Sequence, residues 1–395
     1  MENKRVLISG VGVAGPTLAY WLLRYGFQPT LVEVAPALRT GGYVIDFWGL
    51  GYQVAVKMGL EREILDAGYR VRQLRVVNRD DETEVTLNTD FLRPWTGGGL
   101  TSLPRSELAA VIYRSISGRV ETRFGAIVDT AEGVHVKFDR GQEQDFDLVV
   151  GADGLHSNVR RLAFGPEKDF EKQLGYYVAA FEVPGYRPRD ELTYAMYTRP
   201  GRQAARFSLR KDRTLVLFVF RADAVSDQPS NDLEGRKSFL TLVYGNAGWE
   251  CSNMLRALKL VDDLYFDTVS QIRIQPWSKG HVALIGDAAA CVSLLAGEGT
   301  GLAMSEAYVL SGELARPGEN YLLAFRNYGA KLRHFVERKQ KSALNFASFF
   351  APRTSRGLWL RDQAIRLLRI RPLAYLLAGR SLKDDFNLPD YGSVL

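Results

Sequence analysis

Three glycines and one glutamate near the start of the chain have the types and spacing that bind a dinucleotide. Gly10, Gly12 and Gly15 follow a short apolar run, and Glu33 ends the next apolar run. The first glycine permits a tight turn, the second lets a pyrophosphate approach the backbone, and the third lets a helix pack closely on a strand. Glu33 is then placed to accept hydrogen bonds from a ribose 2′- and 3′-hydroxyl.

The elements that must position these residues are a strand, a glycine turn, a helix and a second strand. Residues 6–8 and 30–32 are apolar and predict the two strands, and a helical pattern starts at Val13 and Ala14 and stops at Gly26. The start of that helix presents unpaired N–H groups and the positive end of its dipole to phosphates. Because an acid at Glu33 repels a 2′-phosphate, the pattern favours FAD or NAD over NADP. An ordinary tight turn is the competing interpretation.

The composition is that of a soluble globular protein with a substantial core. The chain has 395 residues, of which 46% are hydrophobic and 24% are charged, enough for two or three structural units. No run of eighteen apolar residues predicts a membrane span, and the charged start leaves no room for a signal peptide, so we expect a cytoplasmic protein.

Several function classes are disfavoured. The two cysteines and four histidines have no metal-ligand spacing, and no Gly-x-Ser-x-Gly elbow is present, so metal and nucleophilic catalysis are not expected. The net charge of +6 either attracts anionic ligands or reflects a solvated surface. Basic residues gather within 353–380 without a nucleic-acid motif, so no nucleic-acid partner is expected.

Later segments carry further anion-binding signals. Arg105 stands at the start of a predicted helix, where the dipole disfavours a cation, so either a ligand anion pairs with it or it lies on the surface. Asp153 and Gly154 form a turn between a predicted strand and a helix. Asp287 follows a buried strand at 280–285. The helix start beyond it contains Gly297, Gly299, Thr300 and Gly301, which predict a nest for an anion or a carbonyl.

Between residues 175 and 275 the pattern changes to alternating strands rich in Tyr, Phe and Val. Strands are predicted at 175–183, 191–198, 203–210 and 214–221. This alternation indicates an antiparallel sheet with one covered face, which is a plausible platform over a substrate. Helices are predicted at 319–346 and, as a basic amphipathic tail, near 357–377.

Three motifs in order resemble the signatures of the class A FAD-dependent monooxygenases, which have a p-hydroxybenzoate hydroxylase-like fold. They are the glycine pattern at 10–15, the Asp-Gly step within residues 147–154, and Gly-Asp-Ala-Ala at 286–289. The resemblance covers nearly the whole chain. Within that family, residues 10–22, 41–46, 307–314 and 387–391 are similar to the tetracycline destructases and their relatives.

The resemblance implies an α/β fold with a discontinuous Rossmann-type FAD-binding domain, an antiparallel-sheet substrate domain and a C-terminal helix. The FAD-binding domain would comprise residues 1–72, 98–172 and 270–346, the substrate-binding domain 73–97 and 173–269, and the C-terminal segment 347–395. Glu33 would bind the adenosine ribose, Arg105 and Asp287 the ribityl-pyrophosphate region, and the backbone of 297–301 the flavin pyrimidine. The Asp153–Gly154 segment is associated in this family with both FAD and NAD(P)H.

By the same resemblance, NAD(P)H is a transient co-substrate that reduces the flavin. O2 then forms the C4a-hydroperoxide, which hydroxylates an aromatic or polyketide-like molecule, with tetracycline-type antibiotics as candidates and antibiotic resistance as the consequence. The flavin carries the chemistry, so no catalytic side chain is assigned. The protein would be a monomer or a homodimer. An oxidase or dehydrogenase without oxygen insertion shares every motif, and a binding protein that holds FAD or a drug without turnover is a third possibility.

The substrate pocket is expected between the flavin ring and the antiparallel sheet. Trp48, Met196, Phe207 and Phe218 are candidate lining residues and Arg206 a candidate polar anchor, with ordinary packing as the alternative for each. The tail helix near 357–377 is expected either to close the entrance or to pack on the FAD domain.

The loop at 290–298 departs from the family pattern. It lacks the family's histidine and prolines, which loosens the loop, and it has glutamate at 298 in place of glutamine. Glu298 would put a charge near the cofactor unless its carboxyl group points to solvent or is protonated.

Overall fold

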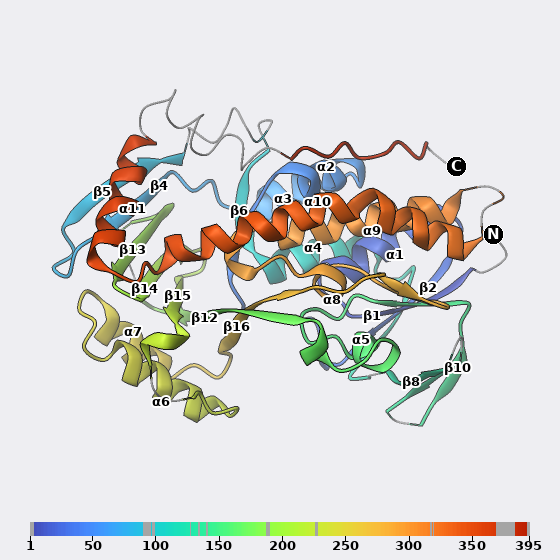
Figure 1. Cartoon of the computed structure of the whole chain (residues 1–395), viewed down its shortest axis with the longest axis horizontal. Helices are drawn as coiled ribbons and strands as arrows, with labels where there is room; N and C mark the ends of the chain where they lie inside the picture. The colour runs from blue at the N-terminus through green and yellow to red at the C-terminus, as the bar shows by residue number, and fades with distance from the viewer. Residues whose placement is uncertain are drawn as a thin grey trace.

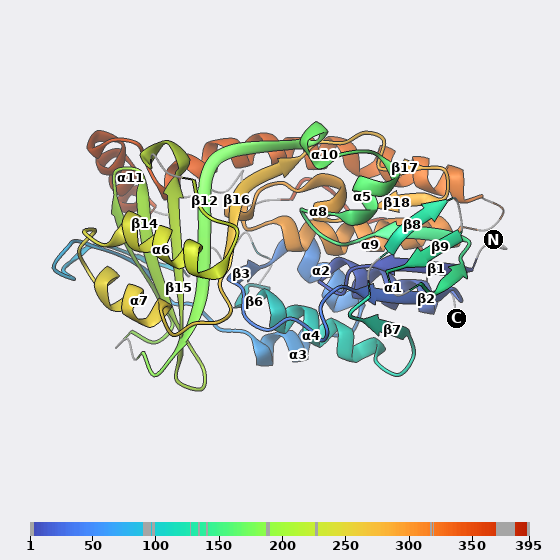
Figure 2. The same ribbon diagram turned by 90° about the horizontal axis from the view of Figure 1, so that it is seen from below.

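The computed structural model shows two lobes joined by one long helix (Figures 1 and 2). The residues that the structure describes are 4–89, 96, 99–126, 128–132, 135–139, 141–186, 190–225, 228–316, 318, 320–368 and 384–392. The lobe near the N-terminus contains a six-stranded sheet, and the opposite lobe contains a seven-stranded sheet. The helix α10, Tyr321–Phe350, crosses from one lobe to the other (Figure 1).

The six-stranded sheet has the order β17-β18-β11-β1-β2-β7, and its five strands from β18 to β7 are parallel. Apolar residues occupy the centre of these strands because a parallel sheet is covered on both faces. The strands are β1 Arg5–Ser9, β2 Gln28–Glu33, β7 Glu121–Phe124, β11 Leu148–Gly151, β17 Ser278–Lys279 and β18 Val282–Leu284. This arrangement, with helices on the sheet, confirms the predicted α/β fold.

Helices accompany this sheet, and several of them begin shortly after one of its strands ends. They are α1 Ala14–Arg24, α2 Gly49–Lys57, α3 Glu61–Ala67, α4 Arg105–Ile116, α5 Asn158–Ala163, α8 Asp287–Ala290 and α9 Gly299–Ala315. Two small sheets accompany them: β3 Val44–Phe47 with β6 Thr101–Pro104, and β8 Val128–Glu132 with β9 His135–Phe138 and β10 Glu143–Asp145.

The glycine turn between β1 and α1 requires glycine at two positions. Gly10 has φ +109°, and a Cβ there would lie 2.4 Å from the carbonyl oxygen of Ala152 on the neighbouring strand end. A Cβ on Gly15 would lie 2.0 Å from the carbonyl oxygen of Gly10. Both contacts are far inside van der Waals distance, so the helix can approach the sheet this closely only with glycine.

The seven-stranded sheet has the order β16-β12-β15-β14-β13-β4-β5. It is antiparallel as predicted except at one junction, because β4 pairs with β13 in parallel. Its strands are β4 Gln73–Val77, β5 Thr83–Asn88, β12 Glu171–Pro184, β13 Thr193–Arg199, β14 Arg202–Leu209, β15 Arg213–Arg221 and β16 Tyr265–Ile272. One face is covered by α6 Leu233–Tyr244 and α7 Cys251–Leu258 (Figure 2).

All seven strands fall within residues 73–97 and 173–269 apart from the ends of β12 and β16. The predicted division into domains stays a prediction. Near the C-terminus, α11 spans Ser355–Leu367, two residues earlier than the predicted start. The predicted continuation to residue 377 lies mostly outside the described residues.

Residues 384–392 form a strap without regular secondary structure that lies along the lobe of the six-stranded sheet (Figure 1). The hydroxyl of Tyr308 donates to the carbonyl of Pro389 at 2.8 Å, and the hydroxyl of Tyr391 donates to Glu313 at 2.7 Å. The ring of Tyr391 fills the space over Gly312, where a Cβ would lie 2.3 Å from the ring. The strap is therefore built into the packing of α9.

Over the part of the chain that the structure describes, no helix combines the length and apolar character that crossing a membrane requires. Among those same residues no cluster of three or more His, Cys, Asp or Glu side chains has the arrangement of a metal site.

Candidate cofactor site

A cavity of about 600 Å³ opens at the carboxyl edge of the six-stranded sheet and reaches the edge of the seven-stranded sheet. Most of the predicted cofactor residues line it, although they come from segments far apart in sequence. They are Gly10, Gly12, Val13, Ala14, Glu33, Arg105, Asp153, Gly154, Asp287, Gly297, Gly299 and Thr300. The fold therefore gathers four separate segments around one space, as expected for open α/β sheets.

Two helix starts face this cavity. Val13 precedes α1 and Glu298 precedes α9, and neither side chain caps its helix. The first N–H groups of both helices are therefore free of side-chain caps, which suits a bound anion or carbonyl group. A Cβ on Gly12 would meet nothing within 4 Å, so the turn before α1 is open on its cavity side.

Glu33 holds the turn as well as lining the cavity. Its Oε2 accepts a hydrogen bond from the N–H of Val11 at 2.9 Å, and its Oε1 accepts one from Ala35 at 3.0 Å. Its side chain is 11% exposed, and Arg39 lies 3.6 Å away. Each carboxylate oxygen has a second lone pair, so these backbone bonds leave capacity for a ribose hydroxyl.

Arg105 and Asp287 meet across the cavity although 182 residues separate them in the chain. The guanidinium NH2 of Arg105, the first residue of α4, lies 3.7 Å from Oδ2 of Asp287. The other oxygen of Asp287 lies 3.4 Å from where a Cβ on Gly299 would be, so the carboxylate sits against the start of α9. This ion pair is partly exposed to the cavity, which leaves both groups accessible to a ligand.

The Asp153–Gly154 turn also lines the cavity. Asp153 accepts hydrogen bonds from the N–H of Val159 at 3.0 Å and from the hydroxyls of Ser157 and Ser9. Burial raises the pKa of Asp153, against the effect of these donors. Asp153 is thus tied to its own loop, and Gly154, with φ +82°, gives the loop its turn.

Two predicted residues do not line the large cavity. Gly15 packs α1 on the sheet, and Gly301 packs α9 against α2. A Cβ on Gly51 of α2 would lie 2.4 Å from the Cα of Gly301, so the two helices touch through glycine. Gly301 therefore sets the position of the α9 start without facing the large cavity.

A second cavity, of only about 20 Å³, has Gly297 as a lining residue in common with the large one. Trp48 and Asp46 line this smaller cavity, and a Cβ on Gly297 would lie 4.0 Å from the Trp48 ring. Burial raises the pKa of Asp46, and Ser102 donates a hydrogen bond to its carboxylate at 2.5 Å. Trp48 is the predicted substrate residue that the structure brings next to the cofactor cavity.

Glu298 lines the smaller cavity and not the large one. Its carboxylate neither points to solvent nor faces the cofactor space, because it pairs with Lys339 of α10 at 2.8 Å. Lys339 also contacts Asp384 of the strap at 2.9 Å. The sequence did not reveal this partner, because Lys339 lies 41 residues further along the chain.

Arg206 and Phe218 lie on the face of the seven-stranded sheet that points away from the cofactor cavity. This corrects the expectation that they contact the substrate. Arg206 is 3% exposed and pairs with Glu250 at 2.9 Å and with Asp190 at 3.2 Å. Phe218 stacks on Tyr244 of α6 with ring centroids 4.1 Å apart. Strand side chains alternate between faces, and both residues fall on the face that α6 and α7 cover.

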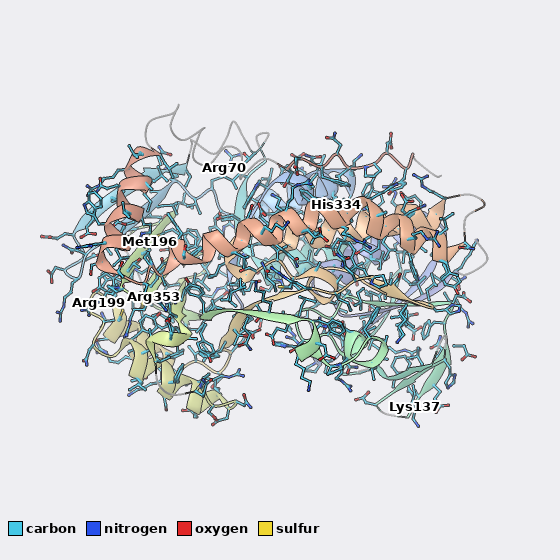
Figure 3. The ribbon with its side chains drawn as sticks, in the orientation of Figure 1. Arg70, Lys137, Met196, Arg199, His334 and Arg353 are labelled. Atoms are coloured by element: carbon cyan, nitrogen blue, oxygen red, sulfur yellow. The ribbon has the colours of Figure 1, made fainter. Side chains whose placement is uncertain are left out.

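Met196 and Phe207 lie on the opposite face but also do not line either cavity. Phe207 is fully buried and stacks on Tyr194, one layer behind the cavity wall. Met196 packs at the outer end of the sheet, in the cluster that includes Val76 and Ile365 of α11 (Figure 3). The structure therefore places Phe207 in the core and Met196, partly buried, against the cluster next to α11.

Sequence reasoning missed several cavity-lining side chains. Tyr43 and Tyr265 both line the large cavity with ring centroids 5.4 Å apart. His156 contacts Asp267 at 3.2 Å and Glu167 at 2.9 Å, and these partners raise its pKa to about 9. The two glycines before Tyr43 were a usable signal. Nothing local to the chain reveals that His156 and Asp267 meet.

These features fit a dinucleotide. Two uncapped helix starts, an open backbone at Gly12, a cation at Arg105 and an acceptor at Glu33 match the pyrophosphate and the ribose of FAD. The cavity size is within the range of cofactor sites. Together they define a flavin- or nicotinamide-binding protein of the doubly wound α/β class.

Comparison with known proteins identifies the family. Residues 3–320 match the model of the FAD binding domain family. The chain is 39% identical over 348 residues to the uncharacterized protein Rv1260 of Mycobacterium tuberculosis, covering 85% of this chain and 92% of that protein. It is 31% identical over 412 residues to a flavin-dependent monooxygenase of an unknown prokaryotic organism, covering 99% of each chain.

Among solved structures, tetracycline destructase Tet(51) is similar with a TM-score of 0.83 and 30% identity, covering 98% of this chain and 100% of that one. The chain belongs to the FAD binding domain family, and it is an FAD-dependent monooxygenase. This confirms the family and the enzyme class expected from the three sequence motifs.

Proposed function

We propose that the enzyme uses NAD(P)H and O2 to hydroxylate an aromatic or polyketide-like small molecule, with tetracycline-type compounds as the first candidates. The observation that carries this proposal is the cavity of about 600 Å³, which most of the predicted cofactor residues line and which extends to Tyr265 at the edge of the seven-stranded sheet. A flavin ring held against the start of α9 would lie near Gly297 and the Trp48 ring, which offers an aromatic surface. The likeness to Tet(51) supports the choice of candidate substrate.

In this proposal the residues of the chain bind and orient FAD and shield it from solvent. Glu33 would hold the adenosine ribose, Arg105 and Asp287 the ribityl-pyrophosphate region, and Asp153–Gly154 the side that the nicotinamide approaches. When bound, FAD supplies the redox chemistry that accepts a hydride and activates O2. The first turn of α9 would stabilise negative charge on the flavin through its N–H groups and its dipole.

The seven-stranded sheet is the proposed substrate-binding part, with residues 73–97 and 173–269 as its boundaries. Tyr265, the first residue of β16, lines the cofactor cavity together with Tyr43. We therefore place the substrate against these two rings and Trp48. Aromatic side chains suit a flat substrate because they offer a large apolar surface with little loss of conformational entropy.

The test is made on the purified protein. A flavin absorption spectrum, NADPH or NADH oxidation stimulated by tetracycline, and a product heavier by one oxygen atom would support the full proposal. Stimulated oxidation without oxygen in the product indicates an oxidase or dehydrogenase. Flavin without stimulation contradicts the tetracycline assignment and directs the search to other aromatic compounds. A Trp48→Ala variant should raise the KM for the substrate and leave FAD affinity unchanged.

A further inference from the structure

A buried carboxyl group lies directly behind the turn that presents Asp287 to the cofactor cavity. Glu306, in the middle of α9, is 1% exposed, and its Oε2 accepts a short hydrogen bond from the backbone N–H of Gly286. Gly286 has φ +63°, and a Cβ there would lie 3.3 Å from the side chains of Ala14 and Ala303. The Glu306 carboxyl group therefore fixes the amide that immediately precedes Asp287.

Glu306 has no cationic partner among the residues that the structure describes. Its Oε1 is buried without a hydrogen bond there. Glu313, two turns further along α9 and 0% exposed, shows the contrast, because Arg316 lies 3.2 Å and Lys331 3.5 Å from its carboxylate. A buried carboxylate without a cation is costly, whereas a neutral carboxylic acid is tolerated.

The groups that face Glu306 come from three sides. The Gly286 turn contributes the backbone N–H and the Asp287 carboxylate, and α10 contributes Tyr328, whose hydroxyl donates to the carbonyl of Leu284 at 3.1 Å. The side that α1 packs against offers Ala14 and no charge. Burial raises the pKa of Glu306 to about 8, with Asp287 adding to the rise and with the Gly286 N–H and the Tyr328 hydroxyl opposing it.

We propose that Glu306 is a positioning residue that works as a neutral acid: it holds the Gly286–Asp287 turn in the conformation that binds FAD, and loss of its proton places a negative charge behind that turn which opposes FAD binding. The inference rests on FAD occupying the large cavity. An ionised Glu306 would put a second negative charge beside Asp287 and the cofactor pyrophosphate. Like charges in a buried environment repel one another, so cofactor affinity should depend on the proton of Glu306.

The experiment measures the FAD dissociation constant of the apoprotein by flavin fluorescence quenching from pH 6 to pH 9 at constant ionic strength. If only the neutral form binds, the apparent dissociation constant equals the intrinsic one divided by the neutral fraction of Glu306. It should therefore be nearly flat up to pH 7 and rise about tenfold by pH 9. Glu306→Gln has the same shape and no proton to lose. Its dissociation constant should stay within about threefold of the wild-type value at pH 7 and remain flat to pH 9.

His156→Gln is the matched control, because His156 lines the same cavity and titrates with a pKa of about 9. This variant should keep the rise with pH if Glu306 causes it. Glu306→Asp keeps the acid but shortens the side chain, so it should bind FAD more weakly at pH 7 and still lose affinity as the pH rises.

Two outcomes would overturn the inference: a wild-type profile that is flat from pH 6 to pH 9, or a Glu306→Gln profile that rises like the wild type. The flat wild-type result is decisive even if no variant folds. Absence of FAD binding at every pH would instead overturn the cofactor site itself, so the two failures are distinguishable.

Discussion

The ammonium group of Lys339 lies 2.8 Å from the Oε1 of Glu298, which joins the middle of α10 to the residue that precedes α9. The same ammonium reaches Asp384 of the strap at 2.9 Å. All three side chains are less than one-fifth exposed. The negative charge of Glu298, which departs from the family pattern, is therefore balanced by a lysine from outside the loop. Its carboxylate does not line the cofactor cavity.

Lys339→Met should destabilise the protein by about 3 kcal/mol, because it leaves two largely buried carboxylates without a cation. Urea denaturation with the free energy of unfolding as the readout measures this loss. The double variant with Glu298→Gln removes one of those carboxylates and should recover part of the stability. A single variant within about 0.5 kcal/mol of the wild type would show that the ion pairs are solvated and weak.

Arg105→Ala should weaken FAD binding by about 10- to 100-fold, the usual effect of losing a charged hydrogen-bond donor to an anion. Equilibrium dialysis of the apoprotein with FAD measures the change. Arg70→Ala is the control, since Arg70 is exposed and the variant has the same change in net charge (Figure 3). Equal affinities in the two variants would remove Arg105 from the cofactor site.

The His156 contacts predict a pH-dependent contribution to stability. Hydrogen bonding to Asp267 is the main cause that raises the pKa of His156 from 6.5 to about 9, so the charged form is stabilised in the folded protein. This contribution is fully present below pH 6.5 and is lost as the pH rises through about 9.

His156→Gln, which carries no charge at any pH, should melt about 1–3 °C below the wild type at pH 6, a small difference because the side chain is half exposed. The melting difference should shrink toward pH 9 and shrink also in high salt. Thermal melts across this range provide the measurement. A difference that stays constant with pH would mean that His156 acts by packing alone.

Gly312→Ala should displace the strap, because a Cβ at this position would lie 2.3 Å from the ring of Tyr391. We expect a loss of about 1–3 kcal/mol and faster hydrogen exchange in residues 384–392. Gly329→Ala on α10 is the matched control, since a Cβ there meets nothing within 4 Å. That variant should be neutral or more stable by up to about 1 kcal/mol. Unchanged exchange in the strap of Gly312→Ala would contradict this account.

The sequence was sufficient for the features that depend on local chain geometry. Gly10 and Gly15 predict the turn because no other residue fits there, and the apolar runs on either side of the turn and its helix predict the parallel strands. Arg105 and Asp287 were both identified, since each occupies the first position of a helix at a strand end. What remained hidden was their contact across the cavity, which depends on the order of the strands.

The substrate-contacting residues were harder to predict from the sequence, because a side chain must be both near the cavity and on the face of the sheet that points toward it. Arg206 and Phe207 are neighbours on β14, yet they point to opposite faces, and nothing in a strand of mixed residues shows which face α6 and α7 cover. The contacts of His156 with Asp267, and of Glu298 with Lys339, join segments more than forty residues apart. Such pairings follow from tertiary packing and leave no periodic signal in the sequence.

The strap has a consequence for the order of events during synthesis. The first turn of α9 faces the cofactor cavity, and Lys339 links the residue before it, Glu298, to Asp384 of the strap. During synthesis the glycine turn, both sheets and α9 leave the ribosome before residues 384–391 do. We therefore expect cofactor loading on a nascent chain to be a late step, because chains that have not yet released the strap lack these contacts with the α9 region.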